Sequence, residues 1–223
     1  MSEERPGHAP RALAKLRRVV DLSPSMTALE VGCGLGLLTR VLAPEVARLT
    51  ALDVSPHAIA QARAAITSPN TTFVTADALS WRTRGKFDLV LALAVFEHFH
   101  PAEQARFFLR ARTWLAPAGR LVLHVPIAES WSASRRTSRR NTDGPDYTGD
   151  PTHHATFSCR SLRAALARGG FAIEKEWIRF SRLGWPPGWA AAVMKAMPPR
   201  WREAFAMEMV VAARATAGVR REV

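Results

Sequence analysis

The stretch from Leu29 to Ala43, LEVGCGLGLLTRVLA, places three glycines within five positions, between an apolar run and a helical pattern. Gly32 permits a tight turn, Gly34 leaves the backbone bare where a ligand can approach, and Gly36 allows the following helix to pack closely. The free N–H groups at the start of that helix favour a negative group. We therefore expect a strand, a glycine turn and a helix that face a nucleotide-like ligand, although glycines also occupy such turns for geometry alone.

Apolar runs and helical patterns alternate on both sides of the glycine turn. Strands are expected at 27–33, 48–54, 71–77, 87–93, 119–126, 171–180 and 204–215, and helices at about 9–22, 35–43, 55–66, 101–115 and 160–168. The strands are apolar along most of their length, which is typical of a parallel sheet covered by helices on both faces. The sequence therefore predicts an α/β fold with a doubly wound sheet, in which ligands bind at the carboxyl ends of the strands.

Two carboxylates stand at the ends of the next two expected strands. Asp53 ends the second strand, where a carboxylate can accept hydrogen bonds from both hydroxyls of a ribose. Asp77 ends the third strand, where the adenine amino group of such a ligand would lie. Three successive strand ends thus offer what an adenosine ligand needs. The spacing G-x-G-x-G differs from the dinucleotide fingerprint G-x-G-x-x-G, so an NAD-dependent enzyme is the weaker alternative.

Six segments together resemble the class I S-adenosylmethionine-dependent methyltransferases, in the small-molecule group that includes the ubiquinone-type O-methyltransferases. The segments are LEVGCGLG, ALDVSPHAIAQAR, VTADAL, FDLVLALAVFEH, LAPAGRLVLHVP and THHATFSCRSLRAALARGGFAI. The resemblance covers about residues 27–180 and is specific as an ensemble. It implies a seven-stranded, mostly parallel, Rossmann-like sheet whose last strand, AFAMEMVVAARA, runs antiparallel to the others.

By position, the resemblance also implies a set of residues that bind the cofactor S-adenosyl-L-methionine. They are Glu30, Gly32, Gly34 and Gly36 around the methionine half, Asp53 at the ribose, Asp77 and Ala78 at the adenine, and Leu93, whose backbone would face the cofactor's amino group. The implied enzyme is a methyltransferase of a small-molecule acceptor, and we expect oxygen as the acceptor atom.

The length of 223 residues suits one domain, with an N-terminal helix at about 9–22 and insertions at about 127–158 and 183–203. No apolar run reaches the roughly 18 residues of a membrane span. Two cysteines are too few for a disulfide framework, so we expect a cytoplasmic protein. The insertion at 127–158 is long and polar, and long loops are usually functional or disordered. We expect it to cover the acceptor.

A hydroxyl acceptor would need a base, for which histidine is the usual choice near neutral pH. The candidates are His154, His98 and His153, and for each of them a structural or exposed side chain is the alternative interpretation. His154 is favoured because THHATFS leads back over the carboxyl edge of the sheet. No metal is expected. Some ubiquinone-type relatives bind a divalent ion with an acidic residue three positions before the Glu-His pair, and Ala94 stands there in this chain.

The sequence does not identify the methyl acceptor, but two features bear on its charge and its aromaticity. The formal net charge is +12, and RRTSRR at 135–140 either grips an anionic acceptor or forms a solvated loop. Four tryptophans predict an aromatic acceptor pocket, a lid, a contact with a membrane surface or a packed cap over the sheet: Trp177, Trp185, Trp189 and Trp201. A nucleic-acid methyltransferase is the first alternative, against which stands LALA in place of the Asn/Asp-Pro-Pro-aromatic signature. A non-catalytic cofactor-binding protein is the second. The oligomeric state cannot be inferred.

Overall fold

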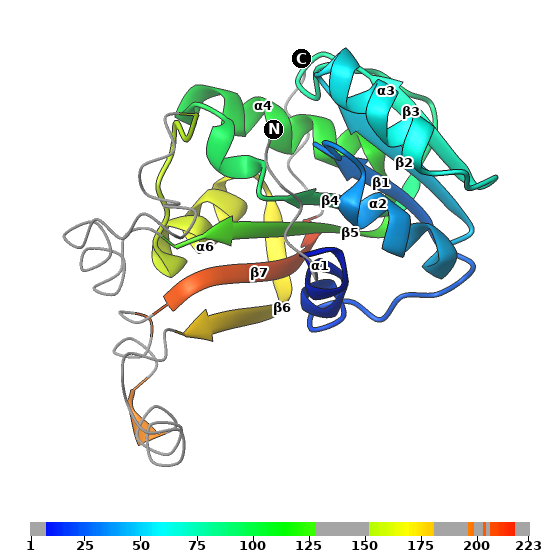
Figure 1. The fold of residues 1–223 in the computed structure, drawn as a ribbon. Helices are drawn as coiled ribbons and strands as arrows, with labels where there is room; N and C mark the ends of the chain where they lie inside the picture. The colour runs from blue at the N-terminus through cyan, green and yellow to red at the C-terminus, as the bar shows by residue number, and fades with distance from the viewer. Residues whose placement is uncertain (1–7, 128–151, 181–195, 199–202, 204–205, 217–223) are drawn as a thin grey trace.

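The computed structural model describes residues 8–127, 152–180, 196–198, 203 and 206–216 (Figure 1). Its centre is a seven-stranded sheet of order β3-β2-β1-β4-β5-β7-β6. The strands are β1 (Thr27–Val31), β2 (Arg48–Asp53), β3 (Thr71–Thr75), β4 (Phe87–Leu93), β5 (Leu115–Pro126), β6 (Phe171–Phe180) and β7 (Ala206–Ala215). The first five pair in parallel, and β7 pairs antiparallel with both β5 and β6. The predicted mostly parallel sheet with an antiparallel last strand is confirmed.

Helices cover both faces of the sheet, because the buried strand residues alternate between two cores. On one face, α4 (Pro101–Trp114) and α6 (Cys159–Arg168) pack over Leu121 and Leu123 of β5. On the other face, α1 (His8–Leu16) and α2 (Leu37–Leu42) pack over Val122 of β5. The helix α3 (Pro56–Ala65) covers Ala51 of β2. Two short 3-10 turns complete the described elements, η1 (Ala43–Glu45) and η2 (Phe96–His98).

The ends of the expected elements differ from the observed ones by a few residues. The strands β4 and β6 have the predicted bounds, whereas β5 begins at Leu115 instead of 119 because Leu115 already pairs with Phe87. The first helix ends at Leu16, before its predicted end near residue 22. Most of the two predicted insertions, 128–151 and 181–195 together with 199–202, lies outside the described residues. The two insertions, and the role of RRTSRR at 135–140 in binding an anion, therefore stay predictions.

Candidate functional site

A cavity of about 830 Å³ lies at the carboxyl ends of β1, β4 and β5, beneath α1. One side is formed by Glu30 at the end of β1, by Gly32 and by the chain that leaves β4 at Leu93 and Ala94. The opposite side is formed by α1, by Trp177 of β6 and by the start of β7. The cavity therefore sits where the sequence predicted a ligand, between the glycine turn and the first helix of the chain.

The three glycines of the turn all have positive φ angles, as the close packing of the turn requires: 71° at Gly32, 53° at Gly34 and 79° at Gly36. A Cβ atom on Gly36 would lie 2.5 Å from Cδ1 of Ile66, so this glycine lets the turn pack against the end of α3. A Cβ on Gly34 would meet nothing within 4 Å. The turn thus presents bare backbone to open space, which is what a ligand lying against it needs.

Glu30 is the buried carboxyl group of the cavity. It is 5% exposed, and Thr39 Oγ1 donates a hydrogen bond of 2.7 Å to its Oε2. Burial, opposed by this hydrogen bond and assisted by the charge of Asp53, raises the pKa of Glu30 from 4.5 to about 7. A buried carboxyl group that lacks a cationic partner is protonated in this way, and it ionises when a cation is brought to it.

Asp53 ends β2 and Asp77 lies two residues after the end of β3, and each already accepts hydrogen bonds from backbone. Asp53 binds the amide of Gly34 through Oδ2 and the amide of Ser55 through Oδ1, each at 2.8 Å. Asp53 therefore holds the glycine turn, and each oxygen keeps a second lone pair. Asp77 Oδ1 accepts from the amide of Leu79 at 2.9 Å. Neither aspartate is among the residues that line the cavity, and the same holds for Gly34, Gly36 and Ala78.

The far side of the cavity carries a cluster of charges around the buried carboxylate of Glu208 of β7. Its Oε2 accepts from Lys15 Nζ at 2.7 Å and from His124 Nε2 at 2.9 Å, and its Oε1 accepts from Arg179 Nε at 2.5 Å. Burial alone would raise the pKa of Glu208, but the hydrogen bonds from His124 and Lys15 hold it far below its usual range. Burial also lowers the pKa of His124 despite the carboxylate beside it, so this imidazole is neutral near pH 7.

Four cations line this side and are called here the cationic wall: Arg11, Lys15, Arg18 and Arg179. These four residues are not among the predicted site residues, although the sequence contains a signal for three of them. Residues 11, 15 and 18 follow the i, i+4, i+7 spacing of one helix face. His124 and Glu208 were also missed, and each is a polar residue with an apolar residue on either side of it in its strand. Such residues are expected to have a partner when buried.

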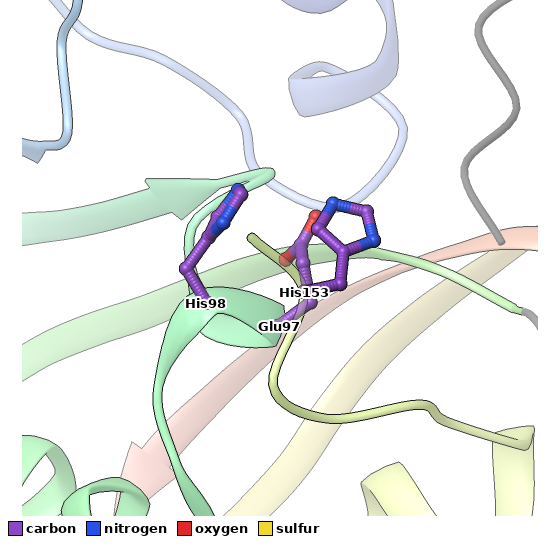
Figure 2. Close-up of side chains that lie close together, drawn as sticks. All are labelled: Glu97, His98 and His153. Atoms are coloured by element: carbon purple, nitrogen blue, oxygen red, sulfur yellow. The ribbon is translucent and has the colours of Figure 1, made fainter. Parts of the chain in front are cut away.

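The candidate bases lie beside the cavity and not in its described lining. The rings of His98 and His153 are 4.8 Å apart, and Figure 2 shows them next to the carboxylate of Glu97, with the three side chains projecting to the same side of η2. His154 stacks on His100 at 3.8 Å. The structure thus brings His98 and His153 together and turns His154 to a different neighbour.

Cys33, next to the glycines, is 6% exposed within the core beneath α3. Burial, followed by the charges of Glu30 and Asp53, raises the pKa of its thiol. A thiol held in its neutral form is a poor nucleophile, so Cys33 serves as packing. Among the described residues, no helix is long and apolar enough to cross a membrane.

Residues 1–176 match the family described as "Methyltransferase domain". The chain is 35% identical over 114 residues to nodulation protein S of Sinorhizobium fredii, which covers 50% of this chain and 53% of the relative. It is 30% identical over 164 residues to trans-aconitate 2-methyltransferase of Methylobacterium radiotolerans, which covers 73% of this chain and 52% of the relative. The chain spans about half the length of the curated relatives it matches.

Solved structures share the fold. The N-methyltransferase NodS of Bradyrhizobium japonicum, in complex with S-adenosylhomocysteine, superposes with a TM-score of 0.62 at 20% identity, covering 96% of this chain and 89% of that one. A methyltransferase structure from Bacillus halodurans superposes with a TM-score of 0.65 at 20% identity, covering 93% of this chain and 100% of that one.

Proposed function

Because the chain belongs to the methyltransferase-domain family, we propose that it transfers the methyl group of S-adenosylmethionine to an oxygen atom of a small anionic acceptor. The observation that carries this proposal is the two-sided cavity. One side has Gly32 of the glycine turn and the buried carboxyl group of Glu30, and the other side has the cationic wall. The family match supports the proposed activity as an S-adenosylmethionine-dependent methyltransferase, and the anionic acceptor is our inference from the cavity.

The residues at the glycine turn fit the cofactor. Open space lies over Gly34, and no cation among the described residues pairs with Glu30, whose pKa burial raises to about 7. We assign the cofactor's ammonium group to Glu30 and to the backbone of Leu93, and its ribose hydroxyls to the remaining lone pairs of Asp53. Asp77 and Ala78 would receive the adenine. When bound, the cofactor supplies a methyl group on a positively charged sulfur, which a nucleophile can displace.

The charges of the cavity favour an anion as the second ligand. Its described lining holds the four cations of the cationic wall against Glu208, which is ionised, and Glu30, which is half ionised near pH 7. The lining is thus net positive before a cofactor with its own sulfonium charge enters. A carboxylate, which accepts paired hydrogen bonds from arginine, offsets this charge. The similarity to trans-aconitate 2-methyltransferase, whose named substrate is a carboxylate, supports the same class.

A carboxylate oxygen changes what the protein has to do. It is already ionised at neutral pH, so no base is needed, and the residues of the cavity align acceptor and cofactor and exclude water. Such alignment contributes up to roughly 7–11 kcal/mol in favourable cases. This agrees with the position of His98, His153 and His154 outside the described lining. For a hydroxyl acceptor, His154 would remain our proposed base.

A second candidate is methylation of nitrogen, which the similarity to the N-methyltransferase NodS favours. The cationic wall argues against it, because an amine acceptor is a cation at neutral pH until it loses a proton. We also propose that nucleic acid is not the acceptor and that the protein works in the cytoplasm.

Labelled S-adenosylmethionine tests the proposal when it is offered with three sets of acceptors: di- and tricarboxylates, phenols, and primary amines. We expect base-labile label on the carboxylates.

Arg18→Gln should then raise KM about tenfold or more with little change in kcat, since a lost hydrogen bond to a charged group costs about 1.5–3 kcal/mol. The matched control is Arg160→Gln on the exposed side of α6. Label confined to amines would overturn the assignment of oxygen. A loss of about 10²-fold in His154→Ala would show that a base is used.

A further inference from the structure

Three side chains beside the cavity form a cluster with the composition of a metal site. One carboxylate oxygen of Glu97 and one ring nitrogen each of His98 and His153 lie within 4.8 Å of one another (Figure 2). Glu97 is 1% exposed, and both histidines are half-buried. Two of these residues belong to η2, and the third comes from a segment 55 positions further along the chain. The fold, and not the local sequence, therefore assembles the cluster.

The backbone holds the two segments together independently of any ion. The amides of His154 and Ala155 both donate to the carbonyl oxygen of Glu97, each at 3.0 Å. Nδ1 of His98 lies 3.0 Å from the carbonyl oxygen of Thr152. A carbonyl only accepts, so Nδ1 of His98 carries the proton and Nε2 is left with its lone pair. A metal-binding histidine is commonly oriented by such a hydrogen bond from its other nitrogen.

We propose that Glu97, His98 and His153 bind one divalent transition-metal ion of the zinc type. Ligands around a tetrahedral ion at about 2.1 Å are about 3.4 Å apart, so rotations of the side chains that close the gaps by about 1 Å suffice. Two imidazoles and one carboxylate suit zinc, cobalt or nickel, whereas magnesium and calcium prefer oxygen ligands. Ala94 provides no ligand in the stretch that contains Glu97 and His98, and His153 supplies the third ligand from a distant segment.

The ion would fasten the segment 152–155 to η2. Three protein ligands leave a fourth position for water or another ligand, as in open zinc sites. Ala94, three residues before Glu97, lines the cavity, so the ion would fix the wall of the cavity from behind. This role does not depend on which acceptor is methylated.

Cobalt provides a direct test, because its visible absorption reports the ligands and their number. The full chain without an added histidine tag is stripped with a chelator, titrated with Co²⁺ near pH 7.5, and then titrated with Zn²⁺. We expect one equivalent of Co²⁺ with the intense bands of a four-coordinate site, displaced by one equivalent of Zn²⁺. At about 100 times its dissociation constant, Zn²⁺ should raise the melting temperature by roughly 5–10 °C.

Variants separate this site from adventitious binding. His153→Ala, at a half-buried position, and His98→Ala should each weaken Co²⁺ binding at least about 100-fold, because each removes one of three ligands. The control is His57→Ala, on the exposed side of α3, where the ring contacts Gln61. Far-ultraviolet circular dichroism checks that each variant is folded. Absence of binding by the folded wild-type protein, or equal affinity in His153→Ala and wild type, would overturn the proposal.

Discussion

Replacement of Glu30 by glutamine should abolish a pH dependence of cofactor binding that the wild-type protein shows. In the free protein, burial raises the pKa of Glu30 to about 7. The ammonium group of S-adenosylhomocysteine, placed beside it, prefers the ionised form. Binding therefore has to remove a proton from Glu30 below pH 7, and affinity should increase as the pH rises.

The size of the effect follows from the ionised fraction of Glu30 in the free protein. With a pKa of about 7, this fraction rises from about 0.03 at pH 5.5 to about 0.76 at pH 7.5. The wild-type affinity should thus rise about 25-fold, or about 1.9 kcal/mol, across this range. Glu208, whose pKa is held far below this range, and Cys33, whose pKa is raised by burial, do not titrate in it. The lowered pKa of His124 is common to wild type and Glu30→Gln, so the difference between the two proteins isolates the contribution of Glu30.

Titration calorimetry with S-adenosylhomocysteine, in two buffers of different ionisation enthalpy, measures both the affinity and the proton released. Glu30→Gln should bind with nearly constant affinity from pH 5.5 to 7.5 and release no proton. The control is Glu45→Gln, because Glu45 pairs with Arg17 at the surface. An equal pH dependence in wild type and Glu30→Gln would refute the assignment of the ammonium group to Glu30.

Asp53→Ala should weaken binding of S-adenosylhomocysteine by about 1.5–3 kcal/mol, and an unchanged affinity in calorimetry would place the ribose elsewhere. Gly36→Ala should lower the free energy of unfolding in urea by about 1–3 kcal/mol or more, because the residue has φ 79° and its Cβ would lie 2.5 Å from Ile66. In Gly34→Ala the added Cβ meets nothing within 4 Å. This variant should therefore lose less free energy of unfolding than Gly36→Ala, but more of its affinity for S-adenosylhomocysteine. The opposite order in either measurement would contradict the roles given to the two glycines. Glu208→Gln should destabilise the protein by about 3–5 kcal/mol near neutral pH. The pKa of Glu208 is lowered in the folded protein, so its contribution to stability is present above pH 4.5 and is lost as the pH falls. The free energies of unfolding of wild type and Glu208→Gln should therefore converge in acid. A constant difference down to low pH would contradict the hydrogen-bond network around Glu208.

The sequence predicted the part of the molecule that depends on local pattern. The apolar strands, the glycine turn and the two aspartates at successive strand ends are each visible within a few residues, so the sheet and the position of the cavity could be predicted. The cationic wall and Glu208 come from α1, the turn that follows it, β6 and β7, and their meeting depends on how β7 inserts between β5 and β6. His153 meets Glu97 for a similar reason, through backbone hydrogen bonds between distant segments. Pattern within one segment contains no information on such pairings.

A crystal structure of the protein with S-adenosylhomocysteine tests the central claim most directly. We expect the homocysteine ammonium group at the Glu30 carboxylate, the ribose hydroxyls at Asp53 and the sulfur facing the cationic wall across the cavity. Electron density for the ligand away from the glycine turn, or a sulfur that points away from Arg11, Lys15, Arg18 and Arg179, would contradict the account.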